Sequence, residues 1–236
     1  ALVAIPLVLD GTGAQRDEFM DLFLDETPPR VTAALIEPCI QFDPAMLRTT
    51  AAVDNGAYVI NGQKAYVPLA EGAEWIRVYA WDQDAGQVDA FLVPGDADGL
   101  AIGVREKLMG VQALPTYPVT LNNVRVPEAH RLGGTDGINY ARIQAHSRVA
   151  LGALAVGVMR GALDYAVQYA KERVQFGKPI ATKQAIAFML AENAIEVDAA
   201  RMMVWEAAWK LDQGQDATKE SYLAKKYVDQ AAVTVT

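Results

Sequence analysis

The hydrophobic pattern of the chain changes its period near residue 133, and this change constrains the fold more than any other feature. Before it, short runs of β-branched and aromatic residues alternate with turn residues. After it, apolar residues recur three or four positions apart over segments far longer than a strand. A period of two is typical of strands and a period near 3.6 of helices, so the sequence predicts an α+β protein in which a sheet precedes a set of helices.

The segment 31–133 carries the signals of an antiparallel sheet. Asn61-Gly62 stands between the runs 58–60 and 63–67, and this dipeptide supplies the positive φ that a two-residue hairpin turn requires. Further strands are expected at 75–81, 88–93 and 118–126. Several short strands at such spacing are typical of a small antiparallel β-barrel or sandwich.

Three helices are expected after residue 133, and a short one between Gln15 and Leu24. Gly214 is placed to end the second of the three, and Asp216 or Thr218 to begin the third. The first two carry apolar stripes at helical spacing, which require partner helices and therefore predict a helical bundle. The stripes are Val156, Met159, Leu163, Val167, Ala170 and Val174 in the first, and Leu190, Val197, Val204 and Leu211 in the second.

Composition excludes several classes of protein. The net charge of −8 disfavours binding to nucleic acid, because neutralising phosphates requires clustered Lys and Arg. Cys39 is the only cysteine, so an intrachain disulfide and a cysteine zinc site are impossible and a reducing compartment is expected. We expect no metal site from His130 and His146, which are few and far apart. No apolar run is long enough to cross a bilayer, so no membrane span is expected.

A cation, an amide and an aromatic ring stand at the break between the two long apolar segments. These residues are Arg173, Gln175 and Phe176, and Gln184 follows where the second segment begins. A guanidinium pairs with phosphate oxygens in a fork and a phenyl ring covers an adenine or flavin edge, so the group suits an anionic, ring-bearing cofactor. Taken by themselves, Arg173 and Phe176 would be better explained as a helix cap and a core residue.

The surrounding sequence favours the cofactor. Blocks along the whole chain resemble the acyl-CoA dehydrogenase family, in the order in which that family has them. The resemblance implies the end of an amino-terminal helical domain at 1–30, a complete middle β domain at 31–133, and the first part of an antiparallel four-helix bundle at 134–236. Since the family's proteins are longer at both ends and this chain lacks an initial Met, we expect a fragment. The matching blocks are 34–38, 60–64, 106–110, 122–127, Arg148 and 173–179.

The resemblance also implies a chemistry. Enzymes of this family bind FAD between the β domain and the bundle, remove the α proton of an acyl-CoA with a carboxylate, and pass the β hydride to the flavin. Arg173, Gln175 and Phe176 would match residues that hold the pyrophosphate and adenine of the FAD in a neighbouring subunit, assisted by Gln184. The expected partners are therefore an acyl-CoA, an electron-transfer flavoprotein and further subunits in a homotetramer or heterotetramer. The expected setting is fatty acid metabolism in the cytoplasm, or in the mitochondrial matrix of a eukaryote.

Residues at the isoalloxazine end depart from the family pattern. Ile36 stands where the family has a threonine, and 39–42 replaces a glycine-rich turn with bulkier residues. Tyr66-Val67-Pro68 replaces Trp-Ile-Thr or Trp-Ile-Ser. Tyr66 can still stack on a ring face. Pro68 has neither a hydroxyl nor a backbone N–H, so it cannot donate a hydrogen bond to flavin N5.

The catalytic base has no match in the chain. The family usually takes a Glu near the end of the bundle, which would lie beyond Thr236, and a minority place it before the residue that matches Arg148. Ser147 occupies that second position. Arg148 itself would lie near the acyl-CoA and could bind an anionic substrate, although a surface salt bridge is a competing explanation.

Three functions are compatible with these residues. The first is an acyl-CoA dehydrogenase-type oxidoreductase. The second is a catalytically degenerate subunit that donates Arg173, Gln175 and Phe176 to a partner while its own flavin half-site has decayed. The third is a flavin oxidase of the same fold, which would consume oxygen without an electron-transfer partner. The acyl chain specificity cannot be read from one sequence.

Overall fold

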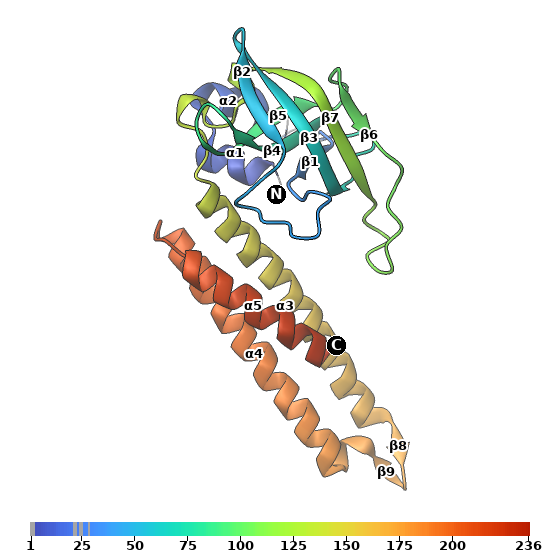
Figure 1. The fold of residues 1–236 in the computed structure, drawn as a ribbon. Coiled ribbons are helices and arrows are strands. Elements are labelled where there is room, and N and C mark those ends of the chain that lie inside the picture. Colours follow the sequence, from blue (N-terminus) through green and yellow to red (C-terminus); the bar gives the residue numbers. More distant parts are fainter. Residues whose placement is uncertain (1–2, 21–22, 24–25, 28) are drawn as a thin grey trace. The chain divides into compact units, whose positions relative to one another are not determined.

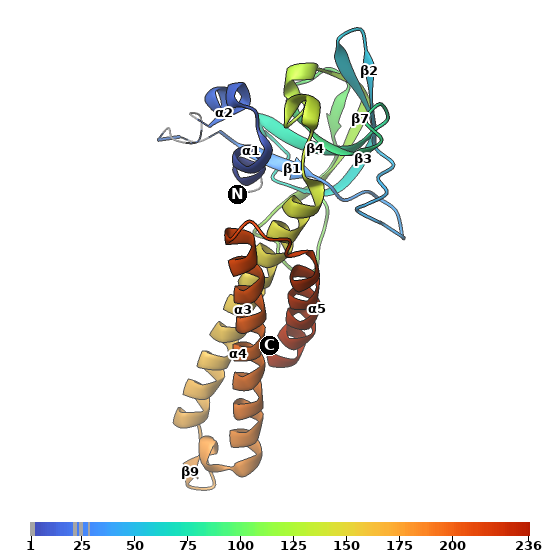
Figure 2. The same cartoon turned by 90° about the vertical axis from the view of Figure 1, so that its left-hand side faces the viewer.

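A computed structural model describes residues 3–236 except 21–22, 24–25 and 28. The chain divides into two compact units, Ala1–Tyr140 and Ala141–Thr236 (Figures 1 and 2). The first contains the sheet and the second the long helices, so the predicted α+β class is confirmed.

A seven-stranded mixed sheet forms the first unit, in the order β1-β4-β2-β3-β7-β6 with β5 also paired to β4 (Figure 1). Antiparallel ladders join β2 to β3, β3 to β7, β4 to β5 and β6 to β7. The sequence predicted a purely antiparallel barrel or sandwich. Most of the strand pairs are antiparallel, but β1 and β2 both run parallel to β4. The strands are β1 Val31–Ala34, β2 Thr50–Asp54, β3 Ala57–Pro68, β4 Trp75–Asp82, β5 Gln87–Pro94, β6 Leu100–Ile102 and β7 Thr116–Pro127.

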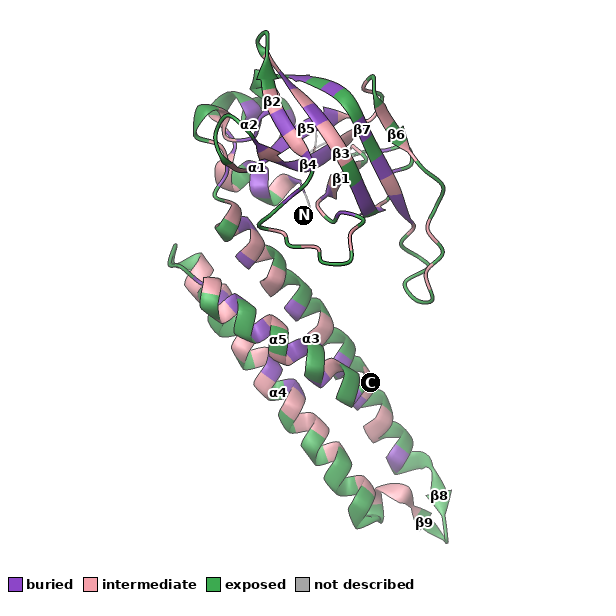
Figure 3. Ribbon diagram, viewed as in Figure 1, coloured by how far each residue is buried: buried purple, intermediate pink, exposed green. Residues whose placement is uncertain are grey.

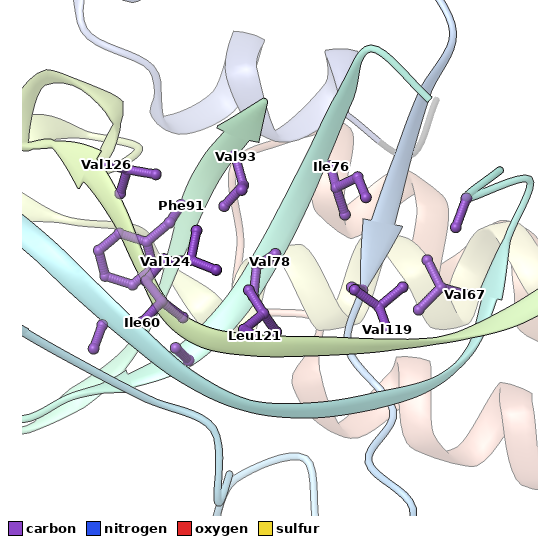
Figure 4. Packing of buried hydrophobic residues seen from close by; sticks show 14 of the residues in the cluster. Ile60, Val67, Ile76, Val78, Phe91, Val93, Val119, Leu121, Val124 and Val126 are labelled. Atoms are coloured by element: carbon purple, nitrogen blue, oxygen red, sulfur yellow. The ribbon is translucent and has the colours of Figure 1, made fainter. Parts of the chain in front are cut away.

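The core of this unit lies between the facing sides of the curved sheet (Figure 4). Ile60, Val78, Phe91 and Val119 are fully buried there, and they come from four different strands. Side chains alternate across a strand, so β3 and β7 place apolar residues inward and polar ones outward. In β5 the run Val88–Val93 is buried at every position, because residues on both faces of this strand are covered.

The hairpin turn predicted at Asn61-Gly62 is wrong. Both residues lie inside the continuous strand β3, where the register against β7 shifts between Ile60 and Gly62. The turn that joins β2 to β3 is Asn55-Gly56, whose φ angles of 49° and 76° are those of a type I′ turn. Position 62 requires glycine for another reason: Thr49 lies so close that a Cβ at this position would be 2.5 Å from its hydroxyl oxygen.

Two short helices precede the sheet, α1 Ala4–Asp10 and α2 Gly13–Phe19. A capping box begins α2: the Thr12 hydroxyl accepts a hydrogen bond from Gln15 N, and the Gln15 side chain accepts one from Thr12 N. The Gln15 amide also donates to the carbonyls of Ala129 and Arg131, which ties the helix to the segment after β7. The helix predicted at 15–24 therefore begins earlier and ends at Phe19, while Leu22 and Leu24 lie outside the described residues.

The second unit consists of three long helices and a small hairpin (Figure 2). Met159, Val197, Ala200 and Val228 form its buried centre, so the two predicted stripes face a common core (Figure 3). Val174 is an exception, since the first helix ends at Glu172 and Val174 is exposed. The elements are α3 Tyr140–Glu172, β8 Val174–Gln175, β9 Lys178–Pro179, α4 Gln184–Asp212 and α5 Thr218–Val235, with short 3-10 turns at Glu128–His130, Gly134–Asp136 and Ile180–Thr182.

The ends of α4 and α5 follow the sequence signals closely. Gly214 adopts a φ of 67° directly after α4, and Gln215 N returns a hydrogen bond to Lys210 O. Asp216 accepts a hydrogen bond from Thr218 N at 2.9 Å and so stabilises the start of α5.

By length and composition, one helix among the described residues could cross a membrane. It is α3, with a mean hydropathy of 1.4 over its most apolar window, so the prediction that no apolar run is long enough is wrong by this measure. Met159 and Leu163 of α3 pack in the core of the helical unit against α4 and α5, although only 22% of the apolar window is buried.

Candidate functional site

The hairpin between α3 and α4 presents the residues singled out in the sequence. Val174 pairs with Pro179 and Gln175 with Lys178, which leaves Phe176-Gly177 as a two-residue turn. Both turn residues have positive φ, 55° and 75°, as a type I′ turn requires. The hairpin is closed at its base by the hydrogen bond from Ile180 N to Arg173 O, 2.8 Å.

Phe176 is 92% exposed, although a phenyl ring gains free energy when it is buried. Arg173, Gln175 and Gln184 are exposed as well. Among the described residues, no carboxylate lies within ion-pair distance of Arg173. Phe176 is therefore not a core residue of this chain, whereas Arg173 does stand at the end of α3, where its N–H donates to Tyr169 O at 2.8 Å. The hairpin presents an unpaired guanidinium, an amide and an exposed ring together.

A second set of candidate residues lies in the first unit, along the end of β3. Tyr66 has a φ of 54° at the place where the register between β3 and β7 shifts, and its ring is half exposed. Its N–H donates to Glu106 Oε1 at 3.3 Å. Ile36 lies beside it, because Ala65 N donates to Ile36 O at 2.8 Å and the Ile36 side chain is exposed. The structure thus places the backbone of Ile36 beside the end of β3 that carries Tyr66.

Pro68 ends the same strand and cannot serve as a donor. Its carbonyl accepts a hydrogen bond from the Thr32 hydroxyl, and its ring nitrogen carries no hydrogen. The next residue, Leu69, is exposed and has a φ of 53°, with its N–H bonded to Pro115 O at 2.8 Å. This part of the surface therefore offers apolar contact and no polar hydrogen.

A buried ion pair holds Ile36 in place, and sequence reasoning missed it. Lys64 Nζ lies 2.9 Å from Glu37 Oε1 and 3.2 Å from Leu35 O, and both charged side chains are almost fully buried. Glu37 also accepts hydrogen bonds from the backbone N–H groups of Arg48 and Thr49. The pair therefore fixes the segment 35–37 on one side to β3 and on the other to the segment before β2.

The same contacts shift the pKa values of both groups. Burial lowers the pKa of Lys64 to about 8, although the hydrogen bond and charge of Glu37 act in the opposite direction. Burial raises the pKa of Glu37, but hydrogen bonds from Thr49, Arg48 and Lys64 outweigh it and leave the pKa below its ordinary value.

Arg148 lies on α3, with its guanidinium 3.6 Å above the centre of the Tyr222 ring. Its side chain also donates a hydrogen bond to Gln144 one turn earlier. No carboxylate of the described residues forms an ion pair with it, so the salt bridge considered from the sequence is absent there. The role of Arg148 at a substrate stays a prediction.

Two other sequence arguments can be followed in the structure. Ser147, at the alternative position for a catalytic base, is an exposed serine and has no acidic function. The described residues contain no group of three side chains that could hold a metal ion.

The hairpin residues fit the adenosine diphosphate half of FAD, because they offer an unpaired cation for phosphate and an exposed ring for stacking. At the other surface, Tyr66 and Ile36 fit the apolar ring system, whereas Pro68 does not fit the hydrogen-bonding atoms at its edge. The fit to FAD is thus good for one half of the cofactor and partial for the other.

Comparisons with known proteins identify the family of both parts of the chain. Residues 32–124 match the family described as acyl-CoA dehydrogenase, middle domain, and residues 135–236 match acyl-CoA dehydrogenase, C-terminal domain. The chain is 38% identical over 205 residues to an acyl-CoA dehydrogenase of Bacillus subtilis, covering 85% of this chain and 54% of that protein. It is 34% identical over 235 residues to the caffeyl-CoA reductase-Etf complex subunit CarC of Acetobacterium woodii, covering 98% of this chain and 62% of that one.

A solved structure gives the same result. Butyryl-CoA dehydrogenase from Megasphaera elsdenii matches with a TM-score of 0.88 and 31% identity, covering 99% of this chain and 62% of that one. The chain thus spans 54–62% of the length of these three proteins. With both of its domains matched in order, the chain belongs to the acyl-CoA dehydrogenase family.

Proposed function

We propose that the protein to which this chain belongs is an FAD-dependent oxidoreductase that removes hydrogen from the α and β carbons of an acyl-CoA thioester. The observation that carries this proposal is the hairpin of Arg173, Gln175 and Phe176, whose exposed and unpaired side chains suit a dinucleotide. Family membership supports the reaction, since the relatives named above are acyl-CoA oxidoreductases by name.

Each residue has a distinct part in this proposal. Arg173 pairs with a phosphate oxygen, Phe176 stacks on a ring, and Gln175 and Gln184 supply amide hydrogen bonds. Following the family resemblance, in which these residues hold the FAD of a neighbouring subunit, we assign the exposed hairpin to a neighbour's cofactor, which requires an oligomer. FAD, when bound, accepts the hydride. Tyr66 and Ile36 cover its ring system and exclude water.

For the substrate, this chain supplies fewer candidate residues than it does for the cofactor. We assign Arg148, whose guanidinium lies over Tyr222, to an anionic part of the acyl-CoA. We assign no described carboxylate as the general base and expect a Glu outside residues 1–236. An electron-transfer flavoprotein is the proposed electron acceptor, supported by the relative whose name places it in an Etf complex.

A second candidate function is favoured by Ile36, Phe42 and Pro68. They remove a hydroxyl, a compact turn and a hydrogen-bond donor from the isoalloxazine side. In this candidate the chain donates its hairpin to the FAD of a catalytic partner and binds no isoalloxazine ring itself.

Flavin analysis of the full-length protein tests both candidates. We expect a yellow protein that releases FAD on denaturation and whose flavin absorbance is bleached by an acyl-CoA under anaerobic conditions. A protein that stays colourless after incubation with excess FAD would contradict the first candidate. An FAD content near one per chain would contradict the second, which requires less than one.

A further inference from the structure

Lys183 occupies a fixed position next to the exposed ring of the hairpin. It is the last residue before α4, its N–H donates to Ile180 O at 2.9 Å, and its carbonyl accepts from Ala187 N at 3.0 Å. The side chain turns back so that Nζ lies 5.5 Å from the centre of the Phe176 ring, above one face. Because the backbone is bonded on both sides, this placement is set by the start of the helix.

The contact leaves most of the ring available. Phe176 remains 92% exposed with the ammonium above it, so a planar group can stack on the ring. A cation over an exposed phenyl face is weakly attracted to it. The attraction orders the lysine side chain without removing its charge or its three N–H donors.

The charge at this end of the helical unit is uncompensated. Within the described part of the chain, no carboxylate forms an ion pair with Arg173, Lys178 or Lys183, although the whole chain has a net charge of −8. Some cations elsewhere in the same unit do have acidic partners. Those pairs are Arg160–Asp164, Arg201–Asp198, Lys210–Glu220 and Lys225–Asp229.

We propose that Lys183 is a further binding residue of the cofactor site and pairs with the pyrophosphate of the dinucleotide whose ring stacks on Phe176. The inference rests on the proposed function, and it names a residue outside the motif that suggested that function. The group that these residues would bind is an adenosine diphosphate. Its aromatic ring would stack on Phe176, and its two phosphates would pair with Arg173 and Lys183.

The start of α4 acts in the same direction. No side chain caps this 29-residue helix, so its first N–H groups remain available next to Lys183. The positive end of a helix favours an anion, and this adds to the two side-chain charges.

The test is the affinity of the full-length protein for FAD, measured by flavin fluorescence after the native cofactor has been removed. We expect Lys183→Gln to weaken binding about tenfold, because the substitution removes a charge-assisted hydrogen bond that solvent partly screens. Lys183→Arg should retain most of the affinity. Lys226→Gln, which removes an equally exposed lysine from α5, is the matched control and should bind FAD as the unaltered protein does.

Salt dependence and ADP competition separate a phosphate contact from a general loss of structure. Losing one phosphate contact should make the affinity for FAD fall less steeply with salt, and should weaken competition by ADP by the same factor as FAD binding. If the unaltered protein binds FAD while Lys183→Gln changes the affinity less than twofold with the same salt dependence, the inference about Lys183 is wrong and the proposed function stands. If the unaltered protein binds no FAD, the proposed function itself fails.

Discussion

Replacing Glu37 by Gln should destabilise the sheet unit by about 3–5 kcal/mol, the cost of removing one partner from a buried ion pair. Three donors converge on this carboxylate: Lys64 Nζ at 2.9 Å, Thr49 N at 2.9 Å and Arg48 N at 2.8 Å. An amide has a single acceptor oxygen, so its NH2 group would face at least one of these donors. Lys64 would lose its anionic partner in a position where its side chain has no exposed surface.

Urea unfolding of the full-length protein measures this loss. With a dependence of about 1–3 kcal/mol per molar urea, the transition of the sheet unit should move down by about 1–3 M. The matched variants are Lys64→Met and the double substitution. If the two groups act as a pair, the double substitution should cost at least about 1 kcal/mol less than the sum of the single ones. A cost below about 1 kcal/mol for Glu37→Gln, or strict additivity, would refute the reasoning.

The pH dependence of the same pair has an unusual sign. The pKa of Lys64 is about 8 in the folded state and 10.5 in the ordinary state, so between these values the unfolded chain binds more protons than the folded one. The contribution of Lys64 to stability therefore increases with pH from about 8 upward, by as much as about 3 kcal/mol. The free energy of unfolding, compared between the unaltered protein and Lys64→Met from pH 7 to pH 10, should show this rise. A difference that stays flat or falls would mean that Lys64 keeps an ordinary pKa.

Three further predictions follow from burial and exposure. Phe176→Ala should change the free energy of unfolding by less than about 0.5 kcal/mol, because the ring is exposed, yet weaken FAD binding about tenfold or more; thermal unfolding and flavin titration check the two effects. Asp89→Asn removes a buried partner from Arg131, 2.5 Å away, and should lower Tm by about 6–20 °C, whereas an unchanged Tm would show that the pair adds nothing. Met159→Ala opens a cavity in the core of the helical unit and should cost about 2–5 kcal/mol in denaturant unfolding; a cost under about 1 kcal/mol would place Met159 outside the core.

The spacing of apolar residues predicted the helices well, because the residues of a helix that are buried recur at the helical period. The stripe through Met159 and Leu163 and the heptads through Val197 and Val204 face one core, as their spacing requires. Pairing was harder to predict. The strands β1 and β2 run parallel to β4, and no local signal in a strand encodes a partner so far away in the sequence.

Turn chemistry was ambiguous for a similar reason. Both Asn55-Gly56 and Asn61-Gly62 have the sequence of a two-residue hairpin turn, and the residues on either side of each dipeptide have a strand-like pattern. What decides between them is a tertiary contact, the approach of Thr49 to Gly62 inside the sheet. A sequence pattern read along one strand contains no information about this neighbour.

In the candidate site, too, contacts between residues that are not neighbours in the sequence could not be predicted. Arg173, Gln175 and Phe176 were recognisable because a contiguous motif carries them, and the hairpin presents all three. Lys183 and the pair of Glu37 with Lys64 become visible only in space, since their partners lie 7 and 27 residues away. Their roles depend on which side chains meet, which the motif alone does not specify.

Backbone strain marks the same surfaces independently of any resemblance. Among the described residues, six other than glycine have positive φ, and four of these carry a large apolar side chain that is exposed. They are Tyr66, Leu69, Val111 and Phe176. A positive φ costs such a residue about 1–3 kcal/mol, and an exposed apolar side chain does not gain the free energy of burial. Neither the backbone conformation nor the exposure therefore stabilises the fold. A ligand that covers a side chain of this kind restores the lost burial, which supports the separate cofactor contacts proposed for Tyr66 and for Phe176.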